Sequence, residues 1–414
     1  MTTTADPAVK TATDRYTIIS ADTHAGGSHE EYREYLDPKY VADFDAWRGQ
    51  YKNPWKDLRD TDLRVRNWDD DRRDRDQLAD GVVAEVIFPN TVPPFYPGFV
   101  LFAGPPTAEE YEHRRAGIHA HNRWMVDFCA RQPERRAGIG QFFLNDIDDA
   151  IADITWIKEQ GLRGGVLLPN VAPDVKYVKP IYHPDYDPIW ACIQDLDLVL
   201  NLHSGTGSPN YGRFPSVPAI MITEIPFYGM RPFVHLLLSG VFERFPRLKF
   251  AITEQGARAM PGMLEQMDAT IAQIRQGEIG ELKYTEENAL PRSATEYFHQ
   301  SVWIGASFPG PLEAQAMEVI GVDRFMWGSD YPHDEGTPPF TKEHLRAVFH
   351  SFPEATLRKI LAENAADLYG FDLDALAPLA AEYGPTVEEI ATPLGNLPAN
   401  PNAALLKSVG KSVI

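Results

Sequence analysis

YTIISADTH, residues 16–24, is a short β-branched run that ends in polar side chains rather than in a turn dipeptide. Such a run predicts a buried strand with functional groups at its carboxyl end. Runs of the same kind follow along the chain: VVAEVIFPN (82–90), RRAGIGQFFLN (135–145), GLRGGVLLPN (161–170), LDLVLNLHSG (196–205), LKFAITEQG (248–256), SVWIGASFPG (301–310) and DRFMWGSDYP (323–332). The chain therefore carries eight candidate strands.

Helix-like segments alternate with these runs along most of the chain. They span residues 109–131, 148–160, 185–194, 231–239, 256–276, 311–320 and 342–349, the last continuing into 354–361. Alternation of strand and helix predicts an α/β fold with a parallel sheet and helices outside it, and eight repeats predict closure into a (β/α)8 TIM barrel. A doubly wound open sheet is the alternative, but no G-x-G-x-x-G follows the first strand.

The barrel is expected over residues 16–370, with inserted βα loops, a flexible N-terminus at 1–15 and a C-terminal arm at 371–414. The insertion at 43–80 is dense in both charges, and we expect it to form a solvated surface of ion pairs. The Pro- and Ala-rich arm is expected to pack across the barrel or a neighbouring subunit. This arm favours a homodimer or a higher homo-oligomer.

The overall composition narrows the class of protein. Lys and Arg number 39 against 59 Asp and Glu, a formal charge of −20, which argues against binding to nucleic acid or to an anionic membrane. The two cysteines cannot build a disulfide framework or a cysteine zinc site. The N-terminus shows no apolar run typical of a signal peptide. We therefore expect a cytoplasmic protein whose partner is a small molecule.

Two long stretches that follow strands, residues 86–108 and 204–230, hold aromatic side chains among Pro and Gly. In a barrel these stretches would lie at the C-terminal face, where long loops usually form a substrate pocket. The competing interpretation of these stretches is structural filler or a subunit contact. For the candidate arginines, the competing interpretation is a surface salt bridge. The candidate substrate contacts are Phe95, Tyr96, Arg213, Tyr228 and Arg258.

Four strand-end residues have the chemistry of metal ligands. Asp22 and His24 stand two apart at the end of the first strand, where residues i and i+2 point to the same side. His203 ends the fifth strand and Asp330 follows the eighth, so all four would reach one barrel mouth. Two carboxylates and two imidazoles suit a borderline divalent cation such as Zn²⁺.

Several segments resemble the amidohydrolase-related family, which includes resorcylate-type decarboxylases and many metal-dependent hydrolases. The segments are IISADTH (18–24), DGVVAEVIFPN (80–90), HNRWMVDFC (121–129), PDYDPIWACIQDLDLVLNLHSG (184–205), IGVDRFMWGSDYPHDEGT (320–337) and LAENAADLYGFD (361–372). The resemblance implies a divalent metal, most often zinc, held by Asp22, His24, His203 and Asp330. Mn²⁺ or Fe²⁺ are the other candidates.

This chain departs from the commoner pattern of that family. Asp22-Thr23-His24 stands where many relatives have His-x-His, and Glu254 ends the sixth strand where many place a catalytic His. The fourth strand, GGVLLP, lacks the Lys of binuclear relatives. We therefore expect one metal ion, with Glu254 as the residue that would recruit a second.

The leading expectation from these residues is a hydrolase of an amide, ester, lactone or thioester, with water activated by the metal and Asp330 moving the proton. The alternative is a non-oxidative decarboxylase of an aromatic or unsaturated acid, with His333 or a protonated Glu254 as the proton donor. A catalytically silent binding protein on a retained barrel is a third interpretation, against which the four placed ligands argue.

Overall fold

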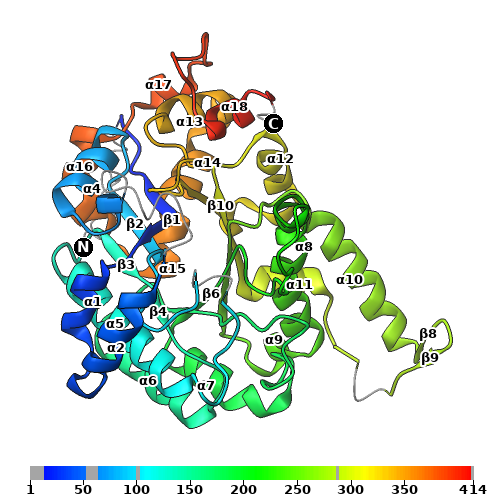
Figure 1. Ribbon diagram of the computed structural model, residues 1–414. Helices are drawn as coiled ribbons and strands as arrows, with labels where there is room; N and C mark the ends of the chain where they lie inside the picture. Colours follow the sequence, from blue (N-terminus) through cyan, green and yellow to red (C-terminus); the bar gives the residue numbers. More distant parts are fainter. Residues whose placement is uncertain (1–13, 53–63, 99–102, 286–288, 412–414) are drawn as a thin grey trace, which may run out of the picture.

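The computed structural model describes residues 14–52, 64–98, 103–285 and 289–411. Its centre is a set of parallel strands, and Figure 1 shows the helices arranged around them. The barrel strands are β1 (Ile19–Ala25), β2 (Ala84–Pro89), β3 (Arg136–Gly138), β4 (Gly140–Gln141), β5 (Val166–Leu167), β6 (Val199–His203), β7 (Lys249–Thr253), β10 (Val302–Ser307) and β11 (Phe325–Gly328). This arrangement confirms the predicted α/β class and the TIM barrel.

The strands pair in the order β1-β2-β3 and, in a second run, β4-β5-β6-β7-β10-β11. The two runs join because β3 and β4 are consecutive pieces of one strand, separated by Ile139, whose N–H donates to Ile87 O at 3.0 Å. At the other edge His24 N donates to Tyr331 O at 2.7 Å, so the segment after β11 lies against β1. The eight strand positions therefore follow the eight runs of the sequence.

The helices cover the outside of this ring. They include α5 (Tyr111–Ala130), α6 (Ile147–Glu159), α7 (Asp187–Asp195), α8 (Val217–Leu238), α9 (Val241–Arg244), α10 (Met260–Arg275), α11 (Ala294–Ser301), α12 (Pro311–Ile320), α13 (Thr341–Phe349), α14 (Glu354–Arg358) and α15 (Asn364–Tyr369). The expected loop at 204–230 is wrong in its second half, because α8 already begins at Val217. Pro218 lies in the first turn, where its missing N–H costs no helical hydrogen bond.

Two apolar layers hold the barrel together. Inside the ring, apolar side chains such as Ile19, Val199 and Met326 fill the axis. Outside it, Trp190 and Phe233 belong to the larger layer between strands and helices. Each fully buried side chain of this size contributes about 1.5–3 kcal/mol relative to exposure, so the mouth residues stand on a rigid base.

The charged insertion folds onto the barrel. After α1 (His29–Tyr35) it contains α2 (Val41–Gln50) and α4 (Asp70–Ala79), and residues 53–63 lie outside the described part of the chain. The expectation of a solvated surface is wrong for Arg73 of α4, which is fully buried. A buried guanidinium must have partners, and those of Arg73 lie beside the barrel mouth.

The C-terminal arm packs on the protein's own barrel. Its helices are α16 (Leu373–Tyr383), α17 (Val387–Ala391) and α18 (Ala403–Ser408), and α17 and α18 contact α13. Tyr16 N donates to Pro385 O at 2.9 Å, which ties the arm to the start of the first strand segment. Residues 1–13 of the expected flexible N-terminus lie outside the described residues. A homodimer stays a prediction.

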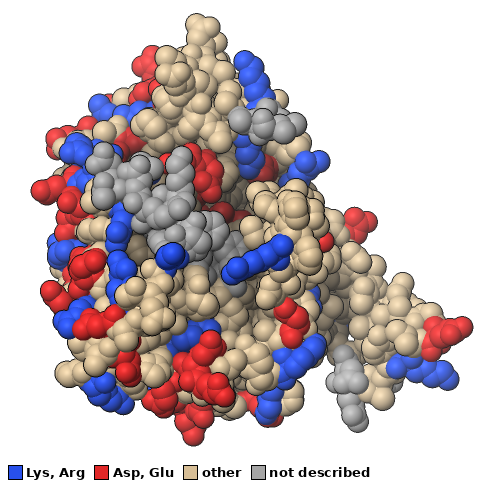
Figure 2. All heavy atoms as spheres, viewed as in Figure 1, with Lys and Arg blue, Asp and Glu red and all other residues tan. Residues whose placement is uncertain are grey.

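The remaining surface features are charge and a protruding hairpin. Figure 1 shows α10 leading away from the barrel to β8 (Glu278–Ile279) and β9 (Leu282–Lys283). Acidic and basic side chains are interspersed over the face in Figure 2, with acidic atoms visible in the hollow at its centre. In the part of the chain that the structure describes, no helix is long and apolar enough to cross a membrane.

Candidate metal centre

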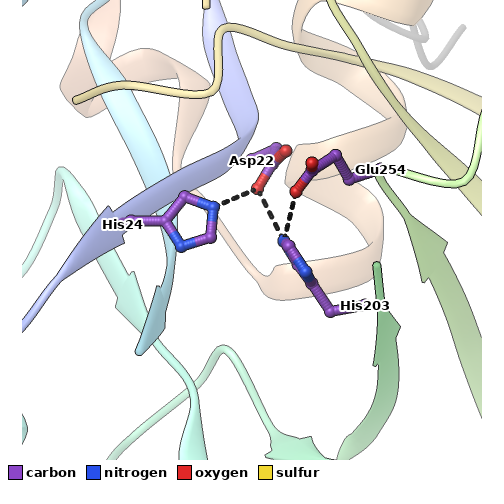
Figure 3. A group of neighbouring side chains, drawn as sticks. All are labelled: Asp22, His24, His203 and Glu254. Carbon is purple, nitrogen blue, oxygen red and sulfur yellow. Dashed lines mark ion pairs between the residues drawn. The ribbon is translucent and has the colours of Figure 1, made fainter. Parts of the chain in front are cut away.

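Acidic and imidazole side chains from separate strands meet at the carboxyl end of the barrel. Asp22 and His24 come from β1, His203 is the last residue of β6, and Glu254 directly follows β7. Figure 3 shows these four side chains pointing toward one another. Their ligand atoms all lie within 4.8 Å of one another, as do those of a second, overlapping group, His24, Asp330 and His333.

An irregularity in β1 sets which residues face the mouth. The pairing register with β2 shifts between Ser20 and Thr23, and Asp22 and His24 both reach the mouth. Thr23 points the other way, and its Oγ1 donates to Glu85 Oε2 at 2.8 Å. The alternation expected of a strand therefore holds from Asp22 to His24, but it depends on this local shift.

The shortest contacts within the group run between imidazole and carboxylate. Asp22 Oδ1 lies 3.5 Å from His24 Nε2 and 3.5 Å from His203 Nε2, and Glu254 Oε2 lies 3.2 Å from His203 Nε2. Asp330 Oδ1 lies 3.3 Å from His24 Nε2. The side chains of Asp22, His24 and His203 are at most 1 % exposed, whereas that of Glu254 is 22 % exposed. Glu254 therefore lies on the open side of the group.

Four buried atoms of this group have no hydrogen-bond partner among the described residues. They are Asp22 Oδ1, His24 Nε2, His203 Nε2 and Asp330 Oδ2. Unpartnered buried polar atoms are costly. Asp22, His24 and His203 belong to one group of neighbouring ligand atoms, and Asp330 belongs to the overlapping group through His24, so a shared ligand would satisfy these atoms. Two imidazole nitrogens and two carboxylate oxygens are the donor set of a borderline divalent cation, so the residues present fit such an ion.

The other ring nitrogens and carboxylate oxygens orient this set. His203 Nδ1 lies 3.2 Å from Ser204 O, and His24 Nδ1 lies 3.5 Å from Pro89 O. A proton on Nδ1 that faces a carbonyl leaves the lone pair on Nε2, as metal-binding imidazoles require. Asp22 Oδ2 accepts a hydrogen bond from Ser307 Oγ, which leaves Oδ1 free.

Backbone strain marks two of the residues at the mouth. Asp330 has φ 63° and Glu254 has φ 56°, both in the left-handed region that non-glycine residues rarely adopt. The backbone of Asp330 is held there by a hydrogen bond from its N–H to Asp22 O at 2.9 Å. Such strain costs about 1–3 kcal/mol per residue and clusters at functional sites.

Burial and charge shift the protonation of the acids at the mouth. Burial, together with the charges of Asp330 and Asp22, raises the pKa of Glu254 well above its usual value. Burial opposes ionisation of Asp330, but the His333 charge, the hydrogen bond with His333 and the nearby His24 outweigh it and lower the pKa of Asp330. The group therefore holds Asp330 ionised and keeps Glu254 protonated over a wider pH range than a free carboxyl.

The pKa values of the imidazoles at the mouth are also shifted in opposite directions. Burial lowers the pKa of His24 to about 4. For His333 burial acts in the same direction, but the Asp330 charge and hydrogen bond prevail and raise its pKa to about 10. His333 Nδ1 lies 2.8 Å from Asp330 Oδ1, and its Nε2 lies 3.2 Å from Asn90 Oδ1. His333 and Asp330 therefore form a hydrogen-bonded, charge-assisted pair.

A buried ion-pair network braces β1 from the outer side. Arg73 Nη1 donates to His24 O at 2.8 Å, and its Nη2 donates to Glu85 Oε2 at 2.6 Å. Arg136 Nε lies 3.6 Å from Glu85 Oε1. Burial alone would raise the pKa of Glu85, but these two arginines lower it overall. The insertion that carries Arg73 therefore orients the backbone between Asp22 and the end of β1.

The predicted substrate contacts are spread more widely. Tyr96 is buried and lines a small cleft at the mouth. Phe95 instead packs against Trp47 and the ring of His113. Tyr228 is half-buried against Phe227, and Arg213 and Arg258 are exposed. The structure brings Tyr96 to the mouth, and the roles of all five residues stay predictions.

Some residues at the mouth have no motif in the sequence. Ser307 contacts Asp22, and Arg73 and Glu85 brace β1, yet none stands out by spacing or composition. Gln141 is the last residue of β4, within the third strand run, and Asn170 ends the fourth run; both are polar and buried. The sequence signal that could have identified Gln141 and Asn170 is a polar residue at the end of a buried strand, but the sequence contains many such residues.

Two cavities lie among the loops that follow the barrel strands. The larger has a volume of about 560 Å³ and is bordered by Tyr177, Tyr211 and Met221, among others. The smaller cleft has a volume of about 30 Å³ and shares Ala103, Gly104 and Asn170 with it. The larger volume lies in the range that holds a small organic ligand.

Comparisons with known proteins agree with this architecture. A family model described as Amidohydrolase matches residues 45–371. Gamma-resorcylate decarboxylase of a Rhizobium species is 24 % identical over 286 residues, covering 66 % of this chain and 83 % of that protein.

Two solved structures share the fold. One is 5-carboxyvanillate decarboxylase from Novosphingobium aromaticivorans, with bound manganese and 3-methoxy-4-hydroxy-5-nitrobenzoic acid; its TM-score is 0.64 at 20 % identity, covering 86 % of this chain and 98 % of that chain. The other is dihydroxybenzoic acid decarboxylase from a Polaromonas species, with manganese and 2-nitroresorcinol; its TM-score is 0.59 at 19 % identity, covering 86 % and 97 %.

These relatives overturn one expectation from the sequence. The prediction of a hydrolase acting on an amide, ester, lactone or thioester is wrong, because the named relatives are decarboxylases. The decarboxylase alternative agrees with them. The preference for zinc has no specific support either, since both solved relatives hold manganese.

Proposed function

The chain belongs to the amidohydrolase family, and we propose that it is a divalent-metal-dependent, non-oxidative decarboxylase of a phenolic acid. The observation that carries the proposal is that three unpartnered buried ligand atoms, on Asp22, His24 and His203, lie within one group, and that His24 also belongs to a second group with the hydrogen-bonded Asp330–His333 pair. The unpartnered ligand atoms would hold the ion that binds the oxygens of the substrate acid. The Asp330–His333 pair would supply the proton that must replace carbon dioxide. The names of the decarboxylase relatives support the same reaction.

The residues that would hold the metal ion are Asp22, His24, His203 and Asp330. A divalent ion bound there supplies a Lewis acid for the carboxylate and the neighbouring phenol oxygen of the substrate. Manganese in the solved relatives makes Mn²⁺ the first ion to test. One ion per chain is proposed, since the two groups of ligand atoms share His24.

Decarboxylation breaks the bond between the ring carbon and the carboxylate, and the electron pair stays on the ring. One proton must then reach that carbon, so the enzyme needs an acid that is protonated at neutral pH. The raised pKa of His333 keeps a proton on the Asp330–His333 pair, at the hydrogen bond between Nδ1 and Oδ1. We assign this pair as the proton donor, which water recharges after each turnover.

Glu254 is a second carboxyl group that can hold a proton. Its raised pKa follows from burial and from the charges of Asp330 and Asp22. A protonated Glu254 adds no negative charge to a site that must accept an anionic substrate. Its role is therefore to hold a proton at the mouth without repelling the anionic substrate that binds there.

The surroundings exclude water from the reacting carbon. Phe88 packs on His203 with ring centroids 4.5 Å apart and also faces His24 at 6.0 Å. An apolar wall next to the imidazoles suits an aromatic ring and keeps the dielectric low, which strengthens the charge interactions described above. A phenolic acid fits this wall better than an aliphatic one.

The test is a panel of hydroxybenzoates, including 2,6-dihydroxybenzoate, assayed for carbon dioxide release by the Mn²⁺-loaded protein. We expect release from at least one member that carries a hydroxyl next to the carboxylate. His203→Ala, which removes one proposed ligand, is expected to abolish release, whereas an equally loaded exposed variant, His113→Ala, retains it. The absence of release across the panel would count against the proposal.

A further inference from the structure

We propose that Gln141, Asn170 and Arg114 form a second recognition site at the mouth, which takes a carboxylate of the substrate that is not lost. The proposal rests on the proposed function in one respect, that the substrate is an aromatic acid. It assigns a substrate class: aromatic compounds with two carboxylates. The site lies in the small cleft that Gln141, Asn170 and Thr206 line.

The cleft adjoins the loop that follows His203. Thr206 lines it, and Thr206 N donates to His203 O at 3.2 Å. At about 30 Å³ the cleft has room for one or two oxygen atoms and not for a ring. A ring would lie outside it, in the adjoining cavity of about 560 Å³. The small volume therefore accepts a substituent of a ligand held by the larger one.

Gln141 directs an amide group into this cleft. Its neighbours at alternate positions, Ile139 and Phe143, belong to the apolar core inside the barrel, so Gln141 faces the interior as they do. Asn122 of α5 holds its backbone by two hydrogen bonds, at 2.9 and 2.8 Å. Gln141 is 3 % exposed, and its Nε2 has no partner among the described residues.

Asn170 presents a second amide nitrogen to the same cleft. Its Oδ1 accepts a hydrogen bond from Gly207 N at 2.7 Å, which fixes the orientation of the amide group. Its Nδ2 is left without a partner in the described part of the chain, although the residue is only 7 % exposed. Two buried amide N–H groups therefore face a space that holds an acceptor.

Arg114 of α5 adds a positive charge behind this cleft. It is 3 % exposed and stacks on Tyr96 at 4.3 Å and on Phe143 at 5.6 Å, two rings that line the cleft. Its Nε and Nη2 have no hydrogen-bond partner, and no described carboxylate pairs with it. Arg114 also hydrogen-bonds with Tyr96, but a buried charge without a counter-charge is costly, and a bound anion nearby reduces that cost.

These groups select a carboxylate over a hydroxyl. The available groups are N–H donors, which match an acceptor-only oxygen, and no acidic side chain borders the small cleft. The one acid at the larger cavity, Asp174, is exposed and accepts from Asn210 N at 3.0 Å. The positive charge of Arg114 favours an anionic acceptor over a neutral carbonyl.

The experiment measures binding, by calorimetry, of benzoate and of the three benzenedicarboxylate isomers to the Mn²⁺-loaded protein. These probes lack the ring hydroxyl of the proposed substrates. Gln141→Glu replaces the amide donor by a carboxylate of the same size, and Gln141→Leu removes the donor without a charge. Gln300→Glu makes the same change as the first in a half-buried glutamine of α11 outside both cavities.

We expect at least one diacid to bind about tenfold more tightly than benzoate. Gln141→Glu should abolish that preference, Gln141→Leu should reduce it, and benzoate affinity, metal content and thermal midpoint should stay unchanged. Gln300→Glu should keep the preference. Equal binding of benzoate and every diacid, or a preference that survives both Gln141 variants, would overturn the proposal. Because the readout is binding, a preference found in a protein that releases no carbon dioxide supports this site and counts only against the proposed reaction.

Discussion

One carboxylate oxygen of Asp330 is shared between two imidazoles: Asp330 Oδ1 lies 2.8 Å from His333 Nδ1 and 3.3 Å from His24 Nε2. The other oxygen, Oδ2, is buried and has no partner in the described part of the chain. Asp330 therefore connects the proposed metal set with the proposed proton donor. Variants of the residues around Asp330 should separate these two roles.

Removing the proton donor should leave the metal in place. His333→Asn deletes the imidazole that pairs with Asp330 but none of the four unpartnered ligand atoms. We expect kcat for carbon dioxide release to fall by about 10²–10⁴, the usual contribution of an acid catalyst, with metal content unchanged. His113→Asn, an exposed histidine of α5, is the matched control and should keep full activity. Loss of metal from the His333 variant would place this residue among the ligands instead.

Metal content should depend on the four proposed ligands. The purified protein is expected to hold about one divalent ion per chain by elemental analysis, and His203→Ala should lose it, because binding needs the full set. Glu254→Gln should retain one equivalent. Two equivalents in the parent protein, falling to one in the Glu254 variant, would contradict a mononuclear site and make Glu254 a ligand.

The ion-pair network behind β1 should be a strong determinant of stability. Glu85→Gln leaves Arg73 buried without its counter-charge, while Arg136 keeps its ion pairs with Asp70 and Asp74. Removing one partner of a buried pair costs about 3–5 kcal/mol. Chemical denaturation should show this loss in the free energy of unfolding. Asp45→Asn, which breaks the exposed pair with Arg33, is the control and should change the midpoint little. Similar effects from both variants would show that the network is not stabilising.

Asp80 should make stability fall as the pH rises. Burial raises its pKa to about 6 in the folded protein, against 3.8 for an ordinary Asp, while Thr341 N donates to Oδ1 at 3.1 Å. The folded state therefore binds the proton more tightly, so the contribution of Asp80 to the free energy of unfolding is highest below about pH 4 and declines as the pH rises through about 6.

Asp80→Asn removes this titration and keeps an acceptor for Thr341. Relative to the parent protein, the variant should gain up to about 3 kcal/mol above pH 7, the value of a shift of about two units, and the gain should shrink as the pH falls to 5. Denaturation curves at several pH values measure this difference. A difference between the two proteins that does not vary with pH would contradict the assigned pKa.

The barrel and its strand-end residues follow from the sequence for a physical reason. Parallel strands must place their carboxyl ends at one face, so Asp22, His203 and Asp330 meet there although they lie far apart in the chain. The apolar runs before them make the strand positions recognisable. The sequence pattern therefore predicts that these residues lie close together, while their roles remain proposals.

Other features depend on contacts that no local pattern encodes. The burial of Arg73 follows from Glu85 and the carbonyl of His24, in a segment whose composition is typical of solvated surface. The start of α8 at Val217 lies in a stretch whose prolines predict a loop. The prediction of the reaction class was wrong for a different reason. A metal ion with a nearby acid serves hydrolysis and decarboxylation alike, and residue types alone do not separate the two reactions.

The central claim is that a carbon–carbon bond of a phenolic acid is broken and one proton takes the place of the carboxylate. The most direct measurement is turnover of a responsive hydroxybenzoate in D₂O, with the product examined by NMR and carbon dioxide quantified. We expect one carbon dioxide per product and one deuterium, at the ring carbon that carried the carboxylate. A product that keeps every carbon of the substrate and instead gains ¹⁸O from labelled water would contradict the account.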